Sequence, residues 1–272
     1  LAEAVAALRA HVAVARVAEV ACSRLSFLCQ ASRQAAAEAG VFEVVTEAMR
    51  AHPQVVHVQE HGCRALVNVC MEDTDSPAVA WARMQRAAQA GAIEAALNAM
   101  RAHPQAGSLQ RWACWALAKV CDGDDAAGLA RSQRAAEAGA IEAVVDAMRA
   151  HPQDEDVQME SCGALTRLCG GGDAAGQARS QRAAEAGAIE EVLVAMRAHP
   201  QVVLVQAKGG EALLNVCGGG ASAAARARRR RATQAGGRVA VAAAMQAHPG
   251  EGGVFCQEVQ RHGQLVLDAL PE

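Results

Sequence analysis

The residues of this chain that could carry out chemistry begin with a His-x-x-Glu-His pattern at positions 57–61. Two histidines four residues apart share one helix face and can bind zinc, with Glu60 as the general base of a peptidase. However, the Val-Gln pair inside the pattern recurs at 157–158 and 205–206 without the histidines, and no later glutamate ligand can be placed. We therefore favour a structural reading of this helix, with zinc binding as the weaker alternative.

Nine of the ten cysteines recur at two fixed places: Cys22, Cys63, Cys114 and Cys162, and seven residues later Cys29, Cys70, Cys121, Cys169 and Cys217. Seven helical residues span about 10 Å, which is more than a disulfide tolerates and does not suit tetrahedral zinc. We expect free, buried thiols that pack as small apolar residues. Free thiols suit a reducing compartment, so we expect a cytoplasmic protein, with the nucleus as the alternative.

Three further sequence patterns are weak indications of a binding site. The loop at Asp122–Asp125 lacks the glutamate that a calcium loop carries at its twelfth position. The glycine triplets 170–172 and 218–220 lack the Lys-Ser/Thr of a phosphate loop. Arg226 and Arg228–Arg231 form a basic run that is either a solvated helix face or a docking patch for an anion. We expect no catalytic residue, no metal site and no cofactor, and hence no enzyme.

The composition excludes several broad classes of protein. The chain has 272 residues, a formal net charge of −3 and only 2% aromatic residues, and much of its apolar content is alanine. Alanine favours helices, and the near-neutral charge argues against nucleic-acid or membrane-surface binding. No apolar run reaches the roughly 18 residues of a membrane span. Because the chain begins with Leu1, we expect a fragment of a longer protein.

These residues are positioned by an internal repeat. The His-Pro pairs at His52, His103, His151, His199 and His248 lie 51, 48, 48 and 49 residues apart. A glutamine follows seven residues after each of these histidines except the last, as Gln59, Gln110, Gln158 and Gln206. Self-similarity at a period of this length is the signature of a repeat protein.

Each repeat reads as three helices. In the fourth, a short polar helix over 130–138 ends at Gly139, which can adopt the left-handed conformation. A second helix over 140–150 carries an apolar stripe and ends before Pro152. A third helix runs from about 154 to 169. The repeated histidine at the end of the second helix can bond the last carbonyls of that helix.

One repeat cannot bury these stripes alone, so neighbouring repeats must stack. We predict an all-α fold, a right-handed α-solenoid, that forms a single domain over 1–272 and is a monomer. Its repeats are a partial one at 1–30 and full ones at 31–71, 72–121, 122–169, 170–217 and 218–272.

The pattern resembles the armadillo repeat, the family of β-catenin and importin-α. The resemblance rests on Ala138-Gly139-Ala140-Ile141 and on Val-Gln followed by Ala-Leu-x-Asn-Val at 58–69 and 205–216. These repeats are about 48 residues long, where the family typically has about 40; the excess lies in the loops before each first helix. HEAT repeats fit less well, because they have two helices. The resemblance implies a concave groove lined by the third helices, in which Asn68 and Asn215 pair with the backbone of an extended peptide.

The outward positions of the third helix give the predicted groove residues. They are His57, His61, Arg64 and Asn68; Ser108, Trp112, Trp115 and Lys119; Asp156, Glu160, Gly163 and Arg167; and Leu204, Lys208, Glu211 and Asn215. Trp115 and Lys119 match the Trp-x-x-x-Asn of importin-α with lysine in place of asparagine, so an import receptor is disfavoured.

We therefore expect a non-catalytic scaffold that binds an extended peptide or a helix of a partner protein in this groove. Trp112 and Trp115 are its expected energetic centre. The alternative is a structural spacer segment of a larger multidomain protein.

Overall fold

The structure is a computed structural model that describes residues 1–71, 76–218 and 220–271. The beginning of the repeat at 72–121, the middle of the glycine triplet 218–220 and the last residue of the chain lie outside the described residues. Within the described ranges the chain forms seventeen α-helices, one 3-10 helix and no strand. The predicted all-α fold is confirmed.

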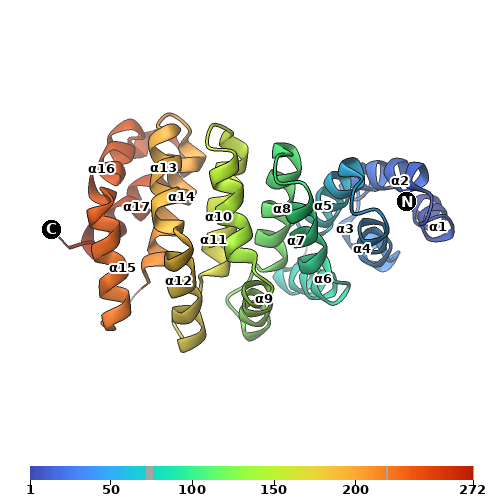
Figure 1. The fold of residues 1–272 in the computed structure, drawn as a ribbon, viewed down its shortest axis with the longest axis horizontal. Helices are drawn as coiled ribbons and strands as arrows, with labels where there is room; N and C mark the ends of the chain where they lie inside the picture. Colours follow the sequence, from blue (N-terminus) through green and yellow to red (C-terminus); the bar gives the residue numbers. More distant parts are fainter. Residues whose placement is uncertain (72–75, 219, 272) are drawn as a thin grey trace. The chain divides into compact units, whose positions relative to one another are not determined.

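The helices repeat in three classes along the chain (Figure 1). The first helices are α3 (Arg33–Glu38), α6 (Pro77–Gln89), α9 (Ala126–Glu137), α12 (Ala174–Ala186) and α15 (Ala223–Gln234). The second helices are α1 (Ala2–Ala10), α4 (Val41–Ala51), α7 (Ala92–Ala102), α10 (Ala140–Ala150), α13 (Ala188–Ala198) and α16 (Gly237–Ala247). The third helices are α2 (Ala15–Leu28), α5 (Val56–Cys70), α8 (Gly107–Val120), α11 (Glu155–Leu168), α14 (Val203–Cys217) and α17 (Val254–Ala269), the last preceded by η1 (Gly250–Gly252).

The contacts within the chain divide it into two compact lobes, Leu1–Ala140 and Ile141–Glu272. In the N-terminal lobe, helices of the same class pack in sequence: α2 against α5 and α5 against α8, α1 against α4 and α4 against α7, α3 against α6 and α6 against α9. In the C-terminal lobe the same holds for α11, α14 and α17, for α13 and α16, and for α12 and α15. This sequential packing of like helices is typical of a solenoid.

Local sequence explains where the helices begin and end. A glycine with positive φ separates each first helix from its second, as at Gly40, Gly91 and Gly139, where φ is 86°, 90° and 90°. Only glycine adopts this conformation at no steric cost. Side chains of Asp125 and Asp173 cap the following first helices by accepting from the backbone N–H three residues later, at 2.8 Å in both cases.

The first helices are longer than the sequence predicted. The expected short helix over 130–138 is instead the twelve-residue helix Ala126–Glu137, and its counterpart α12 has thirteen residues. Capping by Asp125 starts α9 immediately after the loop, so part of the additional length of each repeat is helix rather than loop. The second and third helices lie within one residue of their predicted ends in this repeat.

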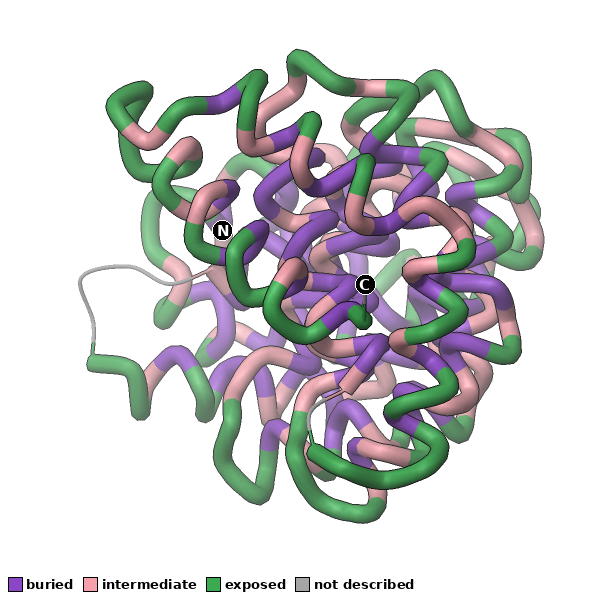
Figure 2. Tube along the Cα trace, turned by 90° about the vertical axis from the view of Figure 1, so that its left-hand side faces the viewer, coloured by how far each residue is buried: buried purple, intermediate pink, exposed green. Residues whose placement is uncertain are grey.

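The core is built from small and medium side chains. Buried positions lie on the helix faces that pack together, and exposed positions gather in the turns and at helix ends (Figure 2). All ten cysteines are free, and all but the half-exposed Cys256 are buried, which confirms the predicted thiols. No helix in the described part of the chain combines the length and the apolar character that crossing a membrane requires.

Candidate functional site

The repeated histidines join consecutive repeats. Four of these histidines, His52, His103, His199 and His248, place Nε2 near a backbone carbonyl at the equivalent turn of the preceding repeat. The distances are 2.6 Å to Val12, 2.8 Å to Pro53, 3.0 Å to Pro152 and 2.9 Å to Pro200, respectively. A carbonyl only accepts, so Nε2 carries the proton in this bond. The expectation that the imidazole bonds the last carbonyls of its own helix is wrong for these four residues, because the ring bonds the preceding repeat. The carbonyls at the helix end are used by other groups, as Ala48 is by the backbone N–H of His52 and Met49 by Gln59.

The repeated glutamine caps the second helix from within the same repeat. Nε2 of Gln59 donates to the carbonyls of Met49 and His52, both at 2.8 Å, and Gln110, Gln158 and Gln206 repeat this pair of bonds. In the last repeat, Gln260 takes the same role twelve residues after His248. These side chains are therefore structural.

Most arginines of the basic run on α15 also make structural contacts within the chain. Arg228 is buried and donates to the Cys217 carbonyl and to Gln177 and Gln181, as its counterpart Arg131 does to Val120, Asp122 and Gln85. Arg231 pairs with Glu190 at 2.6 Å, and Arg226 and Arg229 bond loop carbonyls. Only the exposed Arg230 makes no hydrogen bond to the residues that the structure describes.

The residues best placed for binding lie on the third helices of the N-terminal lobe. Trp112 and Trp115 on α8 are half-buried and stack on each other, with ring centroids 5.2 Å apart and planes 16° apart. Cζ of Arg64 on α5 lies 5.2 Å from the Trp112 ring centroid and 4.3 Å from that of Phe27 on α2. Together Phe27, Arg64, Trp112 and Trp115 form what we call the aromatic–arginine face.

The remaining predicted residues of this lobe surround the face or are already engaged. His57 is exposed and His61 half-buried on α5, with ring centroids 6.3 Å apart. Burial lowers the pKa of the His61 imidazole, and the charges of His57 and Arg64 act in the same direction, against the opposite effects of Glu60 and Glu19.

Other polar residues of the predicted groove bond within the chain. Asn68 is buried and donates from Nδ2 to the Ser26 carbonyl at 2.6 Å. Ser108 donates to Glu60 at 2.7 Å, and Nζ of Lys119 lies 3.7 Å from Asp122. The amide donor that the armadillo resemblance assigns to a peptide backbone is thus already used at Asn68.

In the C-terminal lobe the predicted residues are also engaged. Glu160 is buried and pairs with Lys208 at 3.0 Å, and Asn215 donates to the carbonyl of Glu211 on its own helix at 3.1 Å. Asp156, Gly163, Arg167, Leu204 and Glu211 are half-buried. This lobe brings together no aromatic cluster like that of α2, α5 and α8 among its described residues.

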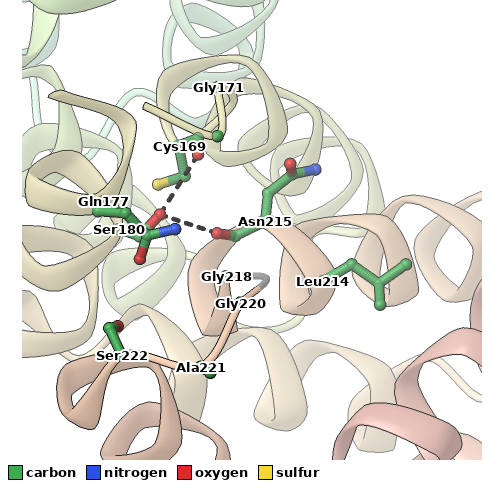
Figure 3. A pocket seen from close by; sticks show the side chains of 11 residues that line it. Cys169, Gly171, Gln177, Ser180, Leu214, Asn215, Gly218, Gly220, Ala221 and Ser222 are labelled. Atoms are coloured by element: carbon green, nitrogen blue, oxygen red, sulfur yellow. Dashed lines mark hydrogen bonds between the residues drawn. The ribbon is translucent and has the colours of Figure 1, made fainter. Parts of the chain in front are cut away.

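A cavity of about 510 Å³ lies in the C-terminal lobe, at the ends of α11 and α14 and beside the loops that follow them (Figure 3). Its wall includes Asn215, Gln177 and Ser180. The Ser180 hydroxyl lies 2.9 Å from the Asn215 carbonyl, 3.0 Å from that of Gly176 and 3.3 Å from that of Cys169. Through the contacts with Cys169 and Asn215, Ser180 braces the ends of α11 and α14.

The described residues hold no group of three or more His, Cys, Asp or Glu side chains that could bind a metal ion. The His-x-x-Glu-His helix therefore offers at most two imidazoles, and its Glu60 is bonded to Ser108. The aromatic–arginine face places flat apolar rings next to a positive charge.

Phe27 is the member of the face that the sequence reasoning missed. It stands two residues before Cys29 and so occupies the place that Asn68, Lys119, Arg167 and Asn215 occupy in later repeats. Extending the outward positions to the partial first repeat would have found it. Arg111, whose Cζ lies 4.9 Å from the Trp112 ring centroid, was missed because it flanks the outward positions.

Comparison of the chain with protein-family models, with curated proteins and with solved structures finds no match in any of the three.

Proposed function

We propose that this chain is an armadillo-type, right-handed solenoid that acts as a non-catalytic protein-binding scaffold. The armadillo assignment is supported by the three classes of helix, the left-handed glycine before each second helix and the Val-Gln start of the third. In this proposal the third helices bind an extended segment or a helix of a partner protein.

The observation that carries the proposal is the aromatic–arginine face. Three side chains of this face are aromatic in a chain with only six aromatic residues, and they lie on α2 and α8, the two third helices that pack against α5 and its Arg64. Phe27 leaves 55% of its surface exposed, and Trp112 and Trp115 are half-buried, so their rings are neither core nor freely solvated. Tryptophan and arginine are the residue types that dominate the binding energy of protein interfaces.

The spacer function remains the second candidate, because a specific observation favours it in the C-terminal lobe. There Glu160 and Lys208 neutralise each other, and Asn215 is bonded to its own helix. A face whose polar groups are satisfied internally offers little for a partner to bind. The proposal therefore assigns the binding role to α2, α5 and α8.

The test is selection of random peptides on the immobilised chain. Three helices about 10 Å apart span about 20 Å, which about seven extended residues cover, so peptides of about twelve residues suffice. In a Trp81→Phe background, the fluorescence of Trp112 and Trp115 reports binding. We expect Trp112→Ala and Trp115→Ala each to weaken the selected peptides at least about tenfold, while the melting temperature changes little.

The matched control is Trp81→Ala. Trp81 leaves 42% of its surface exposed on the first helix α6 and is not one of the predicted groove positions. Its replacement should leave peptide affinity unchanged. Recovery of no peptide, or of peptides that bind the Trp112 and Trp115 variants equally well, would reject the scaffold function in favour of the spacer.

A further inference from the structure

Arg64 is held between two aromatic rings from different helices. Its helix α5 packs against α2 and α8 and lies between them (Figure 1), and the guanidinium carbon lies over both Phe27 and Trp112. Rings over a guanidinium leave its N–H groups accessible only around its edge, in the plane of the group. The side chain is thus in cation–π contact with one ring from each neighbouring third helix.

The N–H donors of Arg64 have no hydrogen-bond partner among the described residues. Nε is buried and forms no hydrogen bond within the described residues, and no hydrogen bond or ion pair among them involves this side chain. Nδ1 of His61, three residues earlier on the same helix, is a second buried nitrogen without a described partner. The contrast with Arg131 and Arg228, whose guanidinium groups bond carbonyls and amides, is clear.

A buried donor without a hydrogen-bond partner is costly. Arg64 as a whole is half-buried, but its Nε is buried and has no partner among the described residues, so the side chain has donor capacity left for an acceptor. The planar guanidinium fits a carboxylate or a phosphate through two parallel N–H···O bonds.

The surrounding charges favour a carboxylate, which carries the smaller negative charge, over a phosphate. Glu60 and Glu19 both lie close enough to act on His61 in this region. These carboxylates would repel a phosphate, with nearly two negative charges, more strongly than a carboxylate with one. The second guanidinium beside Trp112, that of Arg111, already has an interaction within the chain, which leaves Arg64 as the cation for the anion. A single carboxylate balances the single charge of Arg64.

We infer that Arg64 is the subsite for one carboxylate, the side chain of an Asp or Glu in a protein segment bound along α2, α5 and α8. Phe27 and Trp112 hold the guanidinium and cover the apolar part of that side chain, and Trp115 extends the apolar surface for its neighbours in the segment. This inference rests on the proposed scaffold function and adds the chemistry of the partner.

The test is a double-mutant cycle with peptides selected on the wild-type chain. We expect the selected peptides to share an acidic residue, and its replacement by the matching amide to weaken binding at least about tenfold. In the Arg64→Gln protein the same replacement should have no effect, because the partner of the carboxylate is gone. Arg64→Lys, which keeps the charge and loses the planar fork, should recover only part of the affinity.

The control variant is Arg230→Gln, which removes the same charge from an exposed position of α15. This change should leave the affinity for the selected acidic peptide and for its amide variant unchanged. Circular dichroism should show that all protein variants are folded. Phosphoserine in place of the acidic residue should bind less tightly; tighter binding would overturn the choice of carboxylate.

Failure of the carboxylate subsite can be distinguished from failure of the proposed scaffold function. Peptides that require Trp112 and Trp115 but lack a shared acidic residue, or that bind Arg64→Gln equally well, would overturn this inference and leave the scaffold function standing. Absence of any peptide that depends on the two tryptophans would overturn both.

Discussion

Nζ of Lys208 on α14 lies 3.0 Å from Oε2 of Glu160 on α11, and the glutamate side chain is only 5% exposed. Both residues belong to the outward set that the repeat pattern predicts for a groove. The structure instead uses them to join two neighbouring third helices. A predicted binding position can therefore be occupied by a contact inside the chain.

Replacing Lys208 by methionine should destabilise the C-terminal lobe by about 2 kcal/mol, because the buried Glu160 carboxylate loses its charged partner. Urea unfolding measures this change. The second replacement, Glu160→Gln in the Lys208→Met protein, should recover part of the loss. Equal stability of wild type and Lys208→Met would show that the pair contributes nothing.

Replacing His103 by alanine should cost about 1 kcal/mol, since the ring no longer bonds the Pro53 carbonyl of the preceding repeat. Hydrogen exchange should accelerate locally in α4 and α7 rather than along the whole chain. His11→Ala is the matched control, because His11 ends α1 in the first repeat and its ring bonds no described residue. An identical effect of the two changes would contradict the bridging role.

Two glycine-to-alanine changes should have opposite signs. A Cβ at Gly128 in α9 would lie 2.1 Å from the Gly123 carbonyl oxygen, so Gly128→Ala must displace the loop and should cost about 1–3 kcal/mol. A Cβ at Gly163 in α11 meets only the Lys208 side chain, at 3.6 Å, so Gly163→Ala should stabilise by about 0.5–1 kcal/mol. Thermal melting of the two variants distinguishes this from a uniform helix-propensity effect.

Native thiol labelling should report one reactive cysteine. Cys256 is half-exposed and the other nine are buried. We expect Ellman's reagent to modify one thiol per folded chain and all ten in denaturant, and Cys256→Ser to abolish the rapid native reaction. Rapid labelling of several thiols in the folded chain would mean that the repeats open readily.

Stability should fall in alkaline solution. Burial raises the pKa of the Cys70 and Cys169 thiols from 9.0 to about 12. The folded state then binds more protons than the unfolded state between these values, so the contribution is complete below about pH 9 and is lost as the pH rises through about 12. Urea midpoints across this range should decline, and less steeply for a Cys70→Ala/Cys169→Ala protein. Parallel curves would exclude these thiols as the cause.

The helix pattern could be predicted because its signals are local. Gly139 and Pro152 delimit α10, and the observed bounds Ala140–Ala150 equal the predicted ones. The start of α9 was missed by four residues because the sequence reasoning weighed the glycine and aspartate content of the loop and not the capping capacity of Asp125. Side-chain capping selects one of several polar residues, and composition alone does not distinguish them.

The candidate site was predicted only in part, for a different reason. Periodicity assigned Arg64 and Trp112 to one set of outward positions, and Cζ of Arg64 lies 5.2 Å from the Trp112 ring centroid. Periodicity carries no information on which residues bond one another. The hydrogen bond of Asn68 to the Ser26 carbonyl and the ion pair of Glu160 with Lys208 could therefore not be predicted. Such pairings depend on side-chain reach across repeats, which a pattern along one helix does not encode.

The bond between each repeated histidine and the carbonyl of the preceding turn also bears on how such a chain can change in length. Within a lobe, donor and acceptor recur at the same place in every repeat, as at His52 and Val12 and again at His103 and Pro53. Duplication or loss of one whole repeat therefore leaves each ring facing an equivalent carbonyl. Insertion of part of a repeat would separate them, so gene segments that encode whole repeats are the units by which this architecture can grow or shrink.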